Sequence, residues 1–140
     1  MENQKNCIFC KIIKGEIPSY KIYEDENTLA FLDIKPLSKG HVLVIPKKHV
    51  EYLNELDEET AKEVMGIIPK IASAVISQEG VEGWNLLSNN GKFSGQEIFH
   101  IHFHIIPRRN KDGLGYRWNT GDLDSDYAAE FVKNVSEKLK

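Results

Sequence analysis

Residues 98–106 read Ile-Phe-His-Ile-His-Phe-His-Ile-Ile and form the most β-like run of the chain. Because side chains alternate between the two faces of a strand, every second residue of this run projects to the same side. One side carries three imidazoles and the other is apolar, so the sequence predicts a half-buried strand with a polar face. The apolar residues are Phe99, Ile101, Phe103 and Ile105, and the polar face carries His100, His102 and His104.

Three imidazoles on one strand face need an explanation other than packing. Each ring has two nitrogens that require partners, and protonation of all three would place like charges close together. An exposed polar face that uses histidine without a function is the plain alternative. Two kinds of chemistry compete with it. Three histidines can hold a catalytic zinc with an open fourth position, or one histidine can act as a nucleophile with a neighbour as its proton partner.

The two cysteines, Cys7 and Cys10, form a C-x-x-C pair near the start of the chain. In a reducing compartment such a pair is half of a metal site or a redox pair. A redox pair is expected after a strand in a βαβ unit, and this stretch lacks that setting. Two thiolates need two further ligands to close a tetrahedral zinc site. If His100 is one of them, His49, in the loop after the apolar run 41–46, is the natural fourth.

The other periodic segments predict an α+β domain. Apolar residues at helical spacing predict a long helix to about residue 78, capped by Asp57 and kinked by Pro69. Strands that follow one another largely in sequence favour an antiparallel sheet. We therefore expect a five-stranded antiparallel sheet with one long helix and a C-terminal helix, in one domain over residues 1–140. The expected strands are 20–24, 28–33, 41–46, 84–88 and 98–106, and the expected further helices are 7–14 and 125–139.

Composition narrows the classes of partner. The 140 residues carry 18 basic and 21 acidic side chains and a net charge of −3, whereas a reader of nucleic-acid polymers would show a basic patch or stripe. No apolar run approaches the roughly 20 residues that a membrane helix needs. The start of the chain lacks the apolar stretch of a secretory signal. We therefore expect a cytoplasmic protein that binds neither nucleic-acid polymers nor membranes.

The histidine run resembles the His-φ-His-φ-His-φ-φ signature of the histidine triad (HIT) family, in which φ is an apolar residue. The similarity extends from residue 7 to about 107, which suggests a HIT core over about 7–110 and a C-terminal extension over 111–140. The nearest branch resembles bacterial relatives of the Hint purine-nucleoside phosphoramidases. The matching segments are Cys7-Ile-Phe-Cys-Lys-Ile-Ile, Gly15-Glu-Ile-Pro, Phe31-Leu-Asp-Ile, Gly40-His-Val-Leu-Val-Ile-Pro-Lys-Lys-His, and Asn89 ahead of Gly95-Gln96.

The resemblance implies a nucleotide hydrolase or transferase that acts at an α-phosphate. His102 would be the nucleophile that forms a covalent nucleotidyl adduct, and the ligand would be a purine nucleotide or nucleotide conjugate. His104 and His41 would contact the phosphate or assist proton transfer. Glu97 stands where the Hint branch commonly has serine, which bears on the leaving group. The implied nucleotide contacts are Asp33 to the ribose, Asn89 and Gln96 on the phosphate side, and Ile8, Phe9 and Ile12 around the base.

The resemblance also implies a metal and a partner. The distantly related galactose-1-phosphate uridylyltransferases bind zinc through a pattern that maps onto Cys7, Cys10, His49 and His100, so one structural zinc per chain is expected. A homodimer in which two sheets join is expected as well. Three alternatives stay open: a nucleotide-binding regulator with incidental hydrolysis, a dinucleoside polyphosphate hydrolase, and a zinc hydrolase that uses all three strand histidines.

Overall fold

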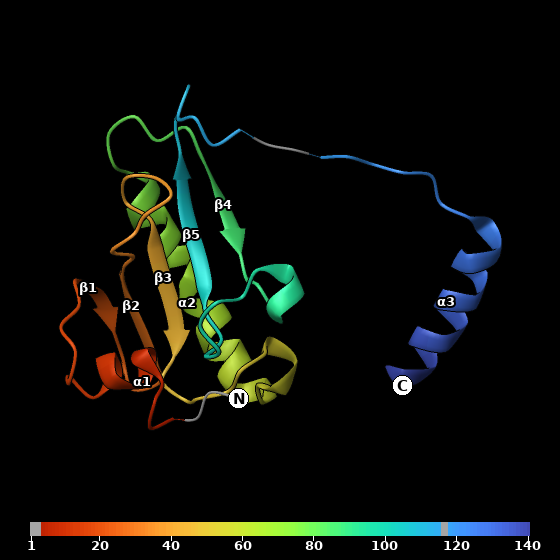
Figure 1. Ribbon diagram of the computed structural model, residues 1–140, viewed down its shortest axis with the longest axis horizontal. Coiled ribbons are helices and arrows are strands. Elements are labelled where there is room, and N and C mark those ends of the chain that lie inside the picture. The colour runs from red at the N-terminus through yellow and green to blue at the C-terminus, as the bar shows by residue number, and fades with distance from the viewer. Residues whose placement is uncertain (1–3, 116–117) are drawn as a thin grey trace.

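The computed structural model describes residues 4–115 and 118–140, and its centre is one antiparallel sheet (Figure 1). Five strands lie in the order β1-β2-β3-β5-β4. This confirms the expected five-stranded antiparallel sheet. The strands are β1 Lys21–Glu24, β2 Thr28–Leu32, β3 Val42–Pro46, β4 Gly83–Leu87 and β5 Phe103–Arg108. The helices are α1 Ile8–Ile13, α2 Glu58–Ile76 and α3 Ser125–Lys138, with short 3-10 turns η1 Leu53–Glu55 and η2 Lys92–Ser94.

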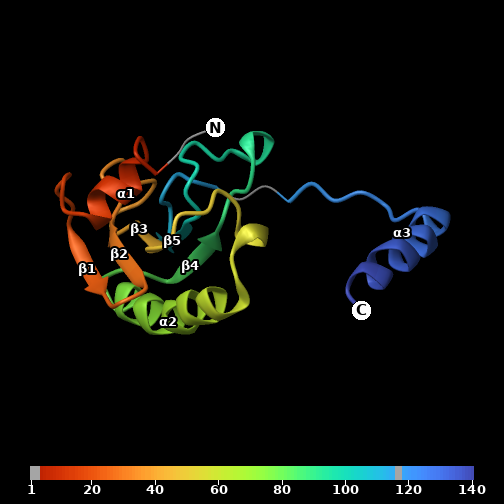
Figure 2. The same cartoon turned by 90° about the horizontal axis from the view of Figure 1, so that it is seen from below.

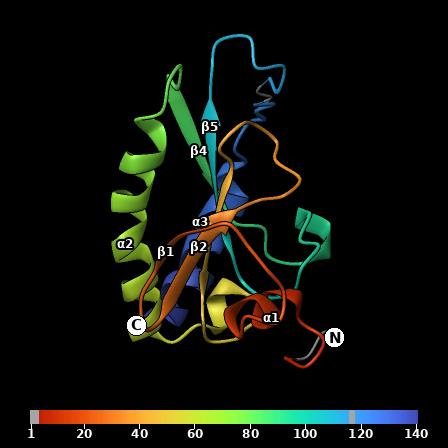
Figure 3. The ribbon, with the colours of Figure 1, turned by 90° about the vertical axis from the view of Figure 1, so that its left-hand side faces the viewer.

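The two faces of the sheet are covered by different helices (Figures 2 and 3). In the β3–β5 register, Val42 lies opposite Ile105 and Leu43 opposite His104, so neighbouring pairs face opposite sides. Val42 and Ile105 pack in the larger core with α2, whereas Leu43 packs in the smaller core with α1. His104 therefore lies on the α1 face of the sheet.

Helix α2 forms where its apolar periodicity predicts it. Asp57 accepts a hydrogen bond from the Thr60 backbone N–H at 3.0 Å and so caps the first turn. The helix continues through Pro69, which is exposed and has no N–H to donate to the carbonyl of Met65. Its buried face is Val64, Ile68, Ile71, Ala72 and Val75. Burial of this face, more than helix propensity, holds the helix on the sheet.

The expected strand 98–106 begins later than predicted, at Phe103. Residues 98–100 form a bend, and the Ile101 backbone N–H donates to the carbonyl of Val50 at 2.8 Å instead of to a sheet strand, so this segment leaves the ladder. The alternation of side chains nevertheless continues across this boundary. Ile101 is buried in the same core as Phe103 and Ile105, while the rings of the three histidines face the α1 side.

Helix α3 stands apart from the sheet, beyond β4, in two perpendicular views (Figures 1 and 2). Its existence confirms the predicted C-terminal helix. No residue of α3 is buried by the described part of the chain. Within residues 4–115 and 118–140, no helix is long and apolar enough to cross a membrane.

Candidate functional site

Four side chains from three separate segments converge beside α1. Cys7 and Cys10 come from the first turn of α1, His49 from the loop after β3, and His100 from the segment before β5. The Cys7 and Cys10 Sγ atoms lie 3.4 and 3.6 Å from His100 Nδ1, and Cys10 Sγ lies 3.4 Å from His49 Nδ1. The two Nδ1 atoms are 3.2 Å apart. The structure therefore brings the four predicted metal ligands together.

The separations fit a tetrahedral zinc site. Zn–S and Zn–N bonds of about 2.3 and 2.05 Å place the ligand atoms of a regular tetrahedron roughly 3.3–3.8 Å apart. His100 Nε2 donates to the carbonyl of Pro46 at 2.8 Å, which leaves the lone pair on Nδ1 facing the cysteines. Burial raises the pKa of the Cys7 thiol to about 12, so a thiolate there needs a cation beside it. The residues present can thus hold a metal ion.

His102 is held in one orientation by its neighbour's backbone. Its Nδ1 lies 2.7 Å from the carbonyl oxygen of His100, and a carbonyl can only accept, so Nδ1 carries the proton. Burial lowers the pKa of His102, which favours the neutral ring. The remaining nitrogen, Nε2, then has an unprotonated lone pair. This is the form in which an imidazole attacks an electrophile.

A backbone donor fixes the tautomers of His41 and His104 as well. The Leu37 N–H donates to His41 Nδ1 at 3.1 Å, so the proton of a neutral His41 is on Nε2. His41 Nε2 lies 2.9 Å from His104 Nδ1 and donates to it. His104 is left with a proton on Nε2. Burial, helped by the nearby His102 and His41, lowers the pKa of His104 to about 4. His104 Nε2–H is therefore a neutral hydrogen-bond donor, on a ring whose centroid lies 4.9 Å from that of His102.

The same tautomers argue against a metal among the strand histidines. Ligand atoms of Asp33, His41 and His104 lie within 4.8 Å of one another, which by spacing alone could hold an ion. The proton on His41 Nε2 occupies the lone pair that a metal would need. His100 is also committed elsewhere, with one nitrogen towards the cysteines and the other on Pro46. The geometry therefore does not support the zinc hydrolase that uses three strand histidines.

An apolar cavity of about 370 Å³ has two wall residues that contact these histidines. It contains most of the predicted nucleotide contacts: Ile8, Phe9, Ile12, Asp33 and Glu97. The Phe9 ring also contacts His102, with centroids 5.1 Å apart, and an Asp33 carboxylate oxygen lies 3.8 Å from His41 Nε2. The cavity therefore adjoins both imidazoles.

Sequence reasoning missed several residues of the cavity wall. Phe31 and Leu43 line it, as do Ile17, Ile34, Lys35 and Ile98. A signal for two of them was present. Phe31 precedes Asp33 by two residues and shares its side of an extended segment, and Leu43 follows His41 at the same spacing.

Asn89 and Gln96 do not line this cavity. The Gln96 side chain is buried, and its oxygen accepts from the Gly91 N–H at 2.8 Å while its nitrogen donates to the carbonyls of Glu51 and Ile98 at 2.8 and 3.1 Å. These bonds position the loop after β4. The Asn89 side chain lies against Gly95, so close that a Cβ at position 95 would be 3.6 Å from the Asn89 side-chain nitrogen. The contact of Asn89 and Gln96 with a phosphate remains a prediction.

On one face of an antiparallel sheet, His102 has an unprotonated Nε2, His104 offers a neutral donor, and an apolar cavity lies on the same side. This arrangement is that of the histidine triad class of proteins. The HIT domain model matches residues 14–111, and the chain belongs to the HIT family. It is 50% identical over 140 residues to the Bacillus subtilis "Protein hit", covering 99% of this chain and 95% of that protein. It is 42% identical over 136 residues to the Schizosaccharomyces pombe "Adenosine 5'-monophosphoramidase hnt1", and the match covers 96% of this chain and 99% of that protein.

Solved structures show the same fold. A crystal structure of a HIT family member from Bacillus subtilis is 48% identical, covers 96% of this chain and 98% of its own, and has a TM-score of 0.90. A zinc-bound histidine triad family protein from Mycobacterium smegmatis is 38% identical, covers 98% and 97%, and has a TM-score of 0.75.

Proposed function

We propose that the protein hydrolyses or transfers nucleotides at the α-phosphate of nucleoside phosphoramidates or related conjugates, through a covalent nucleotidyl-His102 intermediate. One observation carries the proposal: the 2.7 Å hydrogen bond from His102 Nδ1 to the His100 carbonyl, which leaves Nε2 unprotonated on a ring that contacts Phe9 of the cavity wall. The Schizosaccharomyces pombe relative, named an adenosine 5'-monophosphoramidase, supports the substrate class.

In the first step, the Nε2 lone pair of His102 attacks the α-phosphorus and the bond to the leaving group breaks. A leaving amine departs with its electron pair and takes up a proton. Water then attacks the same phosphorus, gives up a proton and releases the nucleoside monophosphate, which restores His102. The neutral His104 Nε2–H would donate to a phosphate oxygen as charge develops on it, and His41 would hold His104 in that tautomer.

The cavity would hold the nucleoside. Ile8, Phe9 and Ile12 give an apolar wall for the base, and Asp33 would accept hydrogen bonds from the ribose hydroxyls. Apolar walls discriminate weakly between bases, so we propose that the cavity prefers purines only through its size and shape. Glu97, also in the cavity wall, would face the leaving group and favour one that carries positive charge.

We propose that one structural zinc ion occupies the site of Cys7, Cys10, His49 and His100. The zinc-bound relative and the tetrahedral spacing support this assignment. Bound zinc would supply no chemistry to the phosphate. It would tie α1, which forms one wall of the cavity, to the segment whose His100 carbonyl orients His102.

We further propose a homodimer joined along the β4 edges, one HIT domain over residues 1–140 with a core near 7–110, and a cytoplasmic location. Strand β4 is the last in the sheet order, so its outer edge is free for a second strand. The free thiols of Cys7 and Cys10 fit a reducing compartment.

The test uses the full chain and an adenosine phosphoramidate. The protein is expected to release AMP, and intact-mass spectrometry of a rapidly quenched reaction is expected to show a nucleotide adduct that maps to His102. His102→Gly should abolish turnover, and added imidazole should restore part of it, because free imidazole can occupy the vacated space. Lys62→Ala, on the exposed side of α2 and on the opposite face of the sheet from the histidines, is the control. Full activity of His102→Gly without imidazole would contradict the mechanism, and tight AMP binding without turnover would favour the regulator instead.

A further inference from the structure

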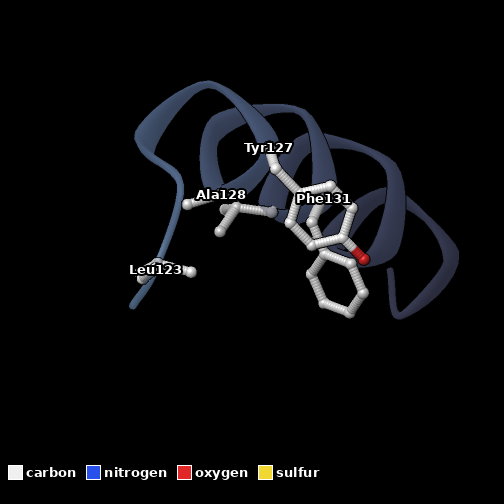
Figure 4. Close-up of a pocket in the computed structure, with 5 residues that line it drawn as sticks. Leu123, Tyr127, Ala128 and Phe131 are labelled. Carbon is white, nitrogen blue, oxygen red and sulfur yellow. The ribbon is translucent and has the colours of Figure 1, made fainter. Parts of the chain in front are cut away.

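Helix α3 carries an apolar stripe that its own chain leaves exposed. Tyr127 and Phe131, one helical turn apart, have ring centroids 5.8 Å apart with their planes tilted by 42°, and are 58% and 50% exposed. Leu123 and Val132 are 78% and 63% exposed. Together with Ala128 these side chains form a shallow apolar hollow on one side of the helix (Figure 4). The opposite side is polar and carries Asp126, Glu130, Lys133 and Glu137.

A helix of this kind needs a surface to pack on. An isolated helix of 14 residues is marginal in water even when its sequence favours helix. The Asp124 side chain caps it by accepting from the Tyr127 N–H at 3.1 Å, but a single cap does not make such a short helix stable by itself. No α3 residue is buried within the described part of the chain, so those residues supply no such surface.

Hydrogen bonds anchor the turn after β5, from which the C-terminal arm (residues 118–140) leaves the domain. Arg108, the last residue of β5, grips Asp112 with two hydrogen bonds of 2.7 and 3.1 Å. The same guanidinium donates to Asn85 on β4 at 2.9 Å and to the carbonyl of Gly115 at 3.0 Å. The turn after β5 is therefore anchored to the edge strand, and the arm departs on the β4 side (Figure 1).

Crystal structures of relatives restrict what the other molecule can be. Residues 118–140 make up about one sixth of this chain, so a TM-score of 0.90 over 96% of it requires part of this segment to superpose as well. A second structure, from Bacillus anthracis, reaches the same TM-score and coverage. At least part of the C-terminal segment is therefore placed similarly in this chain and in both crystallised relatives. What such crystals share is another copy of the chain.

We propose that α3 is exchanged between two copies of this chain, each arm docking its Leu123–Tyr127–Phe131 stripe on the partner next to the partner's β4 edge. That edge presents exposed apolar side chains to receive it: Leu86, Leu87 and, on η2, Phe93. Pairing of two five-residue strands is small beside the roughly 1,200–2,000 Å² of a stable interface, and two exchanged arms supply further area. The inference rests on the proposed homodimer and is independent of the proposed chemistry.

The test places a photoreactive p-benzoylphenylalanine at position 131 of the full chain, and at position 133 as the control on the polar side. The 16.0 kDa chain is expected to give a band of twice its mass from position 131 and little from position 133. Light scattering on the unsubstituted protein measures the dimer separately. A dimer whose position-131 crosslinks map within one chain would overturn the arm exchange and leave the homodimer standing. A monomer at all concentrations would overturn both.

A matched pair of substitutions gives a second measurement. Phe131→Asp should raise the dimer dissociation constant by roughly tenfold or more, because each dimer loses two aromatic contacts. Lys133→Asp puts the same side chain on the polar side and should change it little. Both positions lie outside the core, so circular dichroism should show the same fold. Equal dissociation constants for the two variants would contradict the proposal.

Discussion

The hydrogen bond from His41 to His104 predicts that His41 acts through His104 and not on the substrate directly. The perturbation is removal of each side chain alone and of both together, as His41→Ala, His104→Ala and the double variant. In the structure, the Leu37 N–H fixes His41, and His41 Nε2 at 2.9 Å fixes the tautomer of His104. Loss of His41 should therefore leave the His104 ring in place, but the tautomer and the orientation of His104 would no longer be fixed.

The geometry sets the expected sizes. Removing one preorganised donor to a developing charge costs about 10²–10³ in kcat, which is the expectation for His104→Ala. A neutral hydrogen bond contributes about 0.5–1.5 kcal/mol, so loss of the one from His41 should cost roughly 2- to 10-fold. If His41 acts only through His104, the double variant should be no slower than His104→Ala.

The assay is kcat for AMP release from an adenosine phosphoramidate, with KM recorded for each variant. Ser38→Ala is the matched control for loop damage, because it removes the 2.7 Å bond from Ser38 Oγ to the Pro107 carbonyl in the same loop. The Ser38 backbone carbonyl, which accepts from the His41 N–H at 3.1 Å, is kept. It should leave kcat within about twofold. A double variant whose loss equals the product of the two single losses would refute the reasoning, since independent action gives additive free energies.

Three further predictions concern the metal, the acid limit and the sugar. Replacing Cys7 and Cys10 by serine should lower the zinc content from one ion per chain to none, measured by elemental mass spectrometry, and should lower the melting temperature. An unchanged zinc content would disprove the site. Because the pKa of His104 falls from 6.5 to about 4 on folding, its contribution to stability is present above pH 6.5 and is lost as the pH falls to about 4. The free energy of unfolding, measured across that window, should depend less on pH for His104→Gln than for the wild type. An equal pH dependence of the two proteins would exclude this contribution of His104. Asp33→Asn should reduce the preference for ribose over 2',3'-dideoxyribose substrates several-fold in kcat/KM, and an unchanged preference would place the ribose elsewhere.

The period-two spacing of the histidine run identified the right residues, but it could not locate the start of the strand. The alternation of Ile101, Phe103 and Ile105 is a local property that a sequence displays directly. The departure of the segment before Phe103 from the ladder depends on a hydrogen bond from Ile101 to Val50, 51 residues earlier in the chain. Such a partner has no local signature, because any residue can offer a backbone carbonyl.

The same limit applies to the site. C-x-x-C spacing and the resemblance to the HIT family gave the four residues that the structure brings together. Neither could reveal that Leu37 fixes the tautomer of His41, or that Gln96 is held by three bonds to the backbone. Amphipathic spacing likewise predicted α3, but the pattern does not show which surface the apolar side meets.

His100 contributes to two networks with two different parts of itself. Its ring belongs to the cysteine cluster, whereas the group that orients His102 is its backbone carbonyl. Every amino acid has that carbonyl, so substitution at position 100 removes the ring and spares the orienting bond wherever the backbone keeps its path. The two functions can therefore drift apart over evolutionary time. A lineage can discard its metal ligands one by one and keep its chemistry, whereas position 102 has no such freedom.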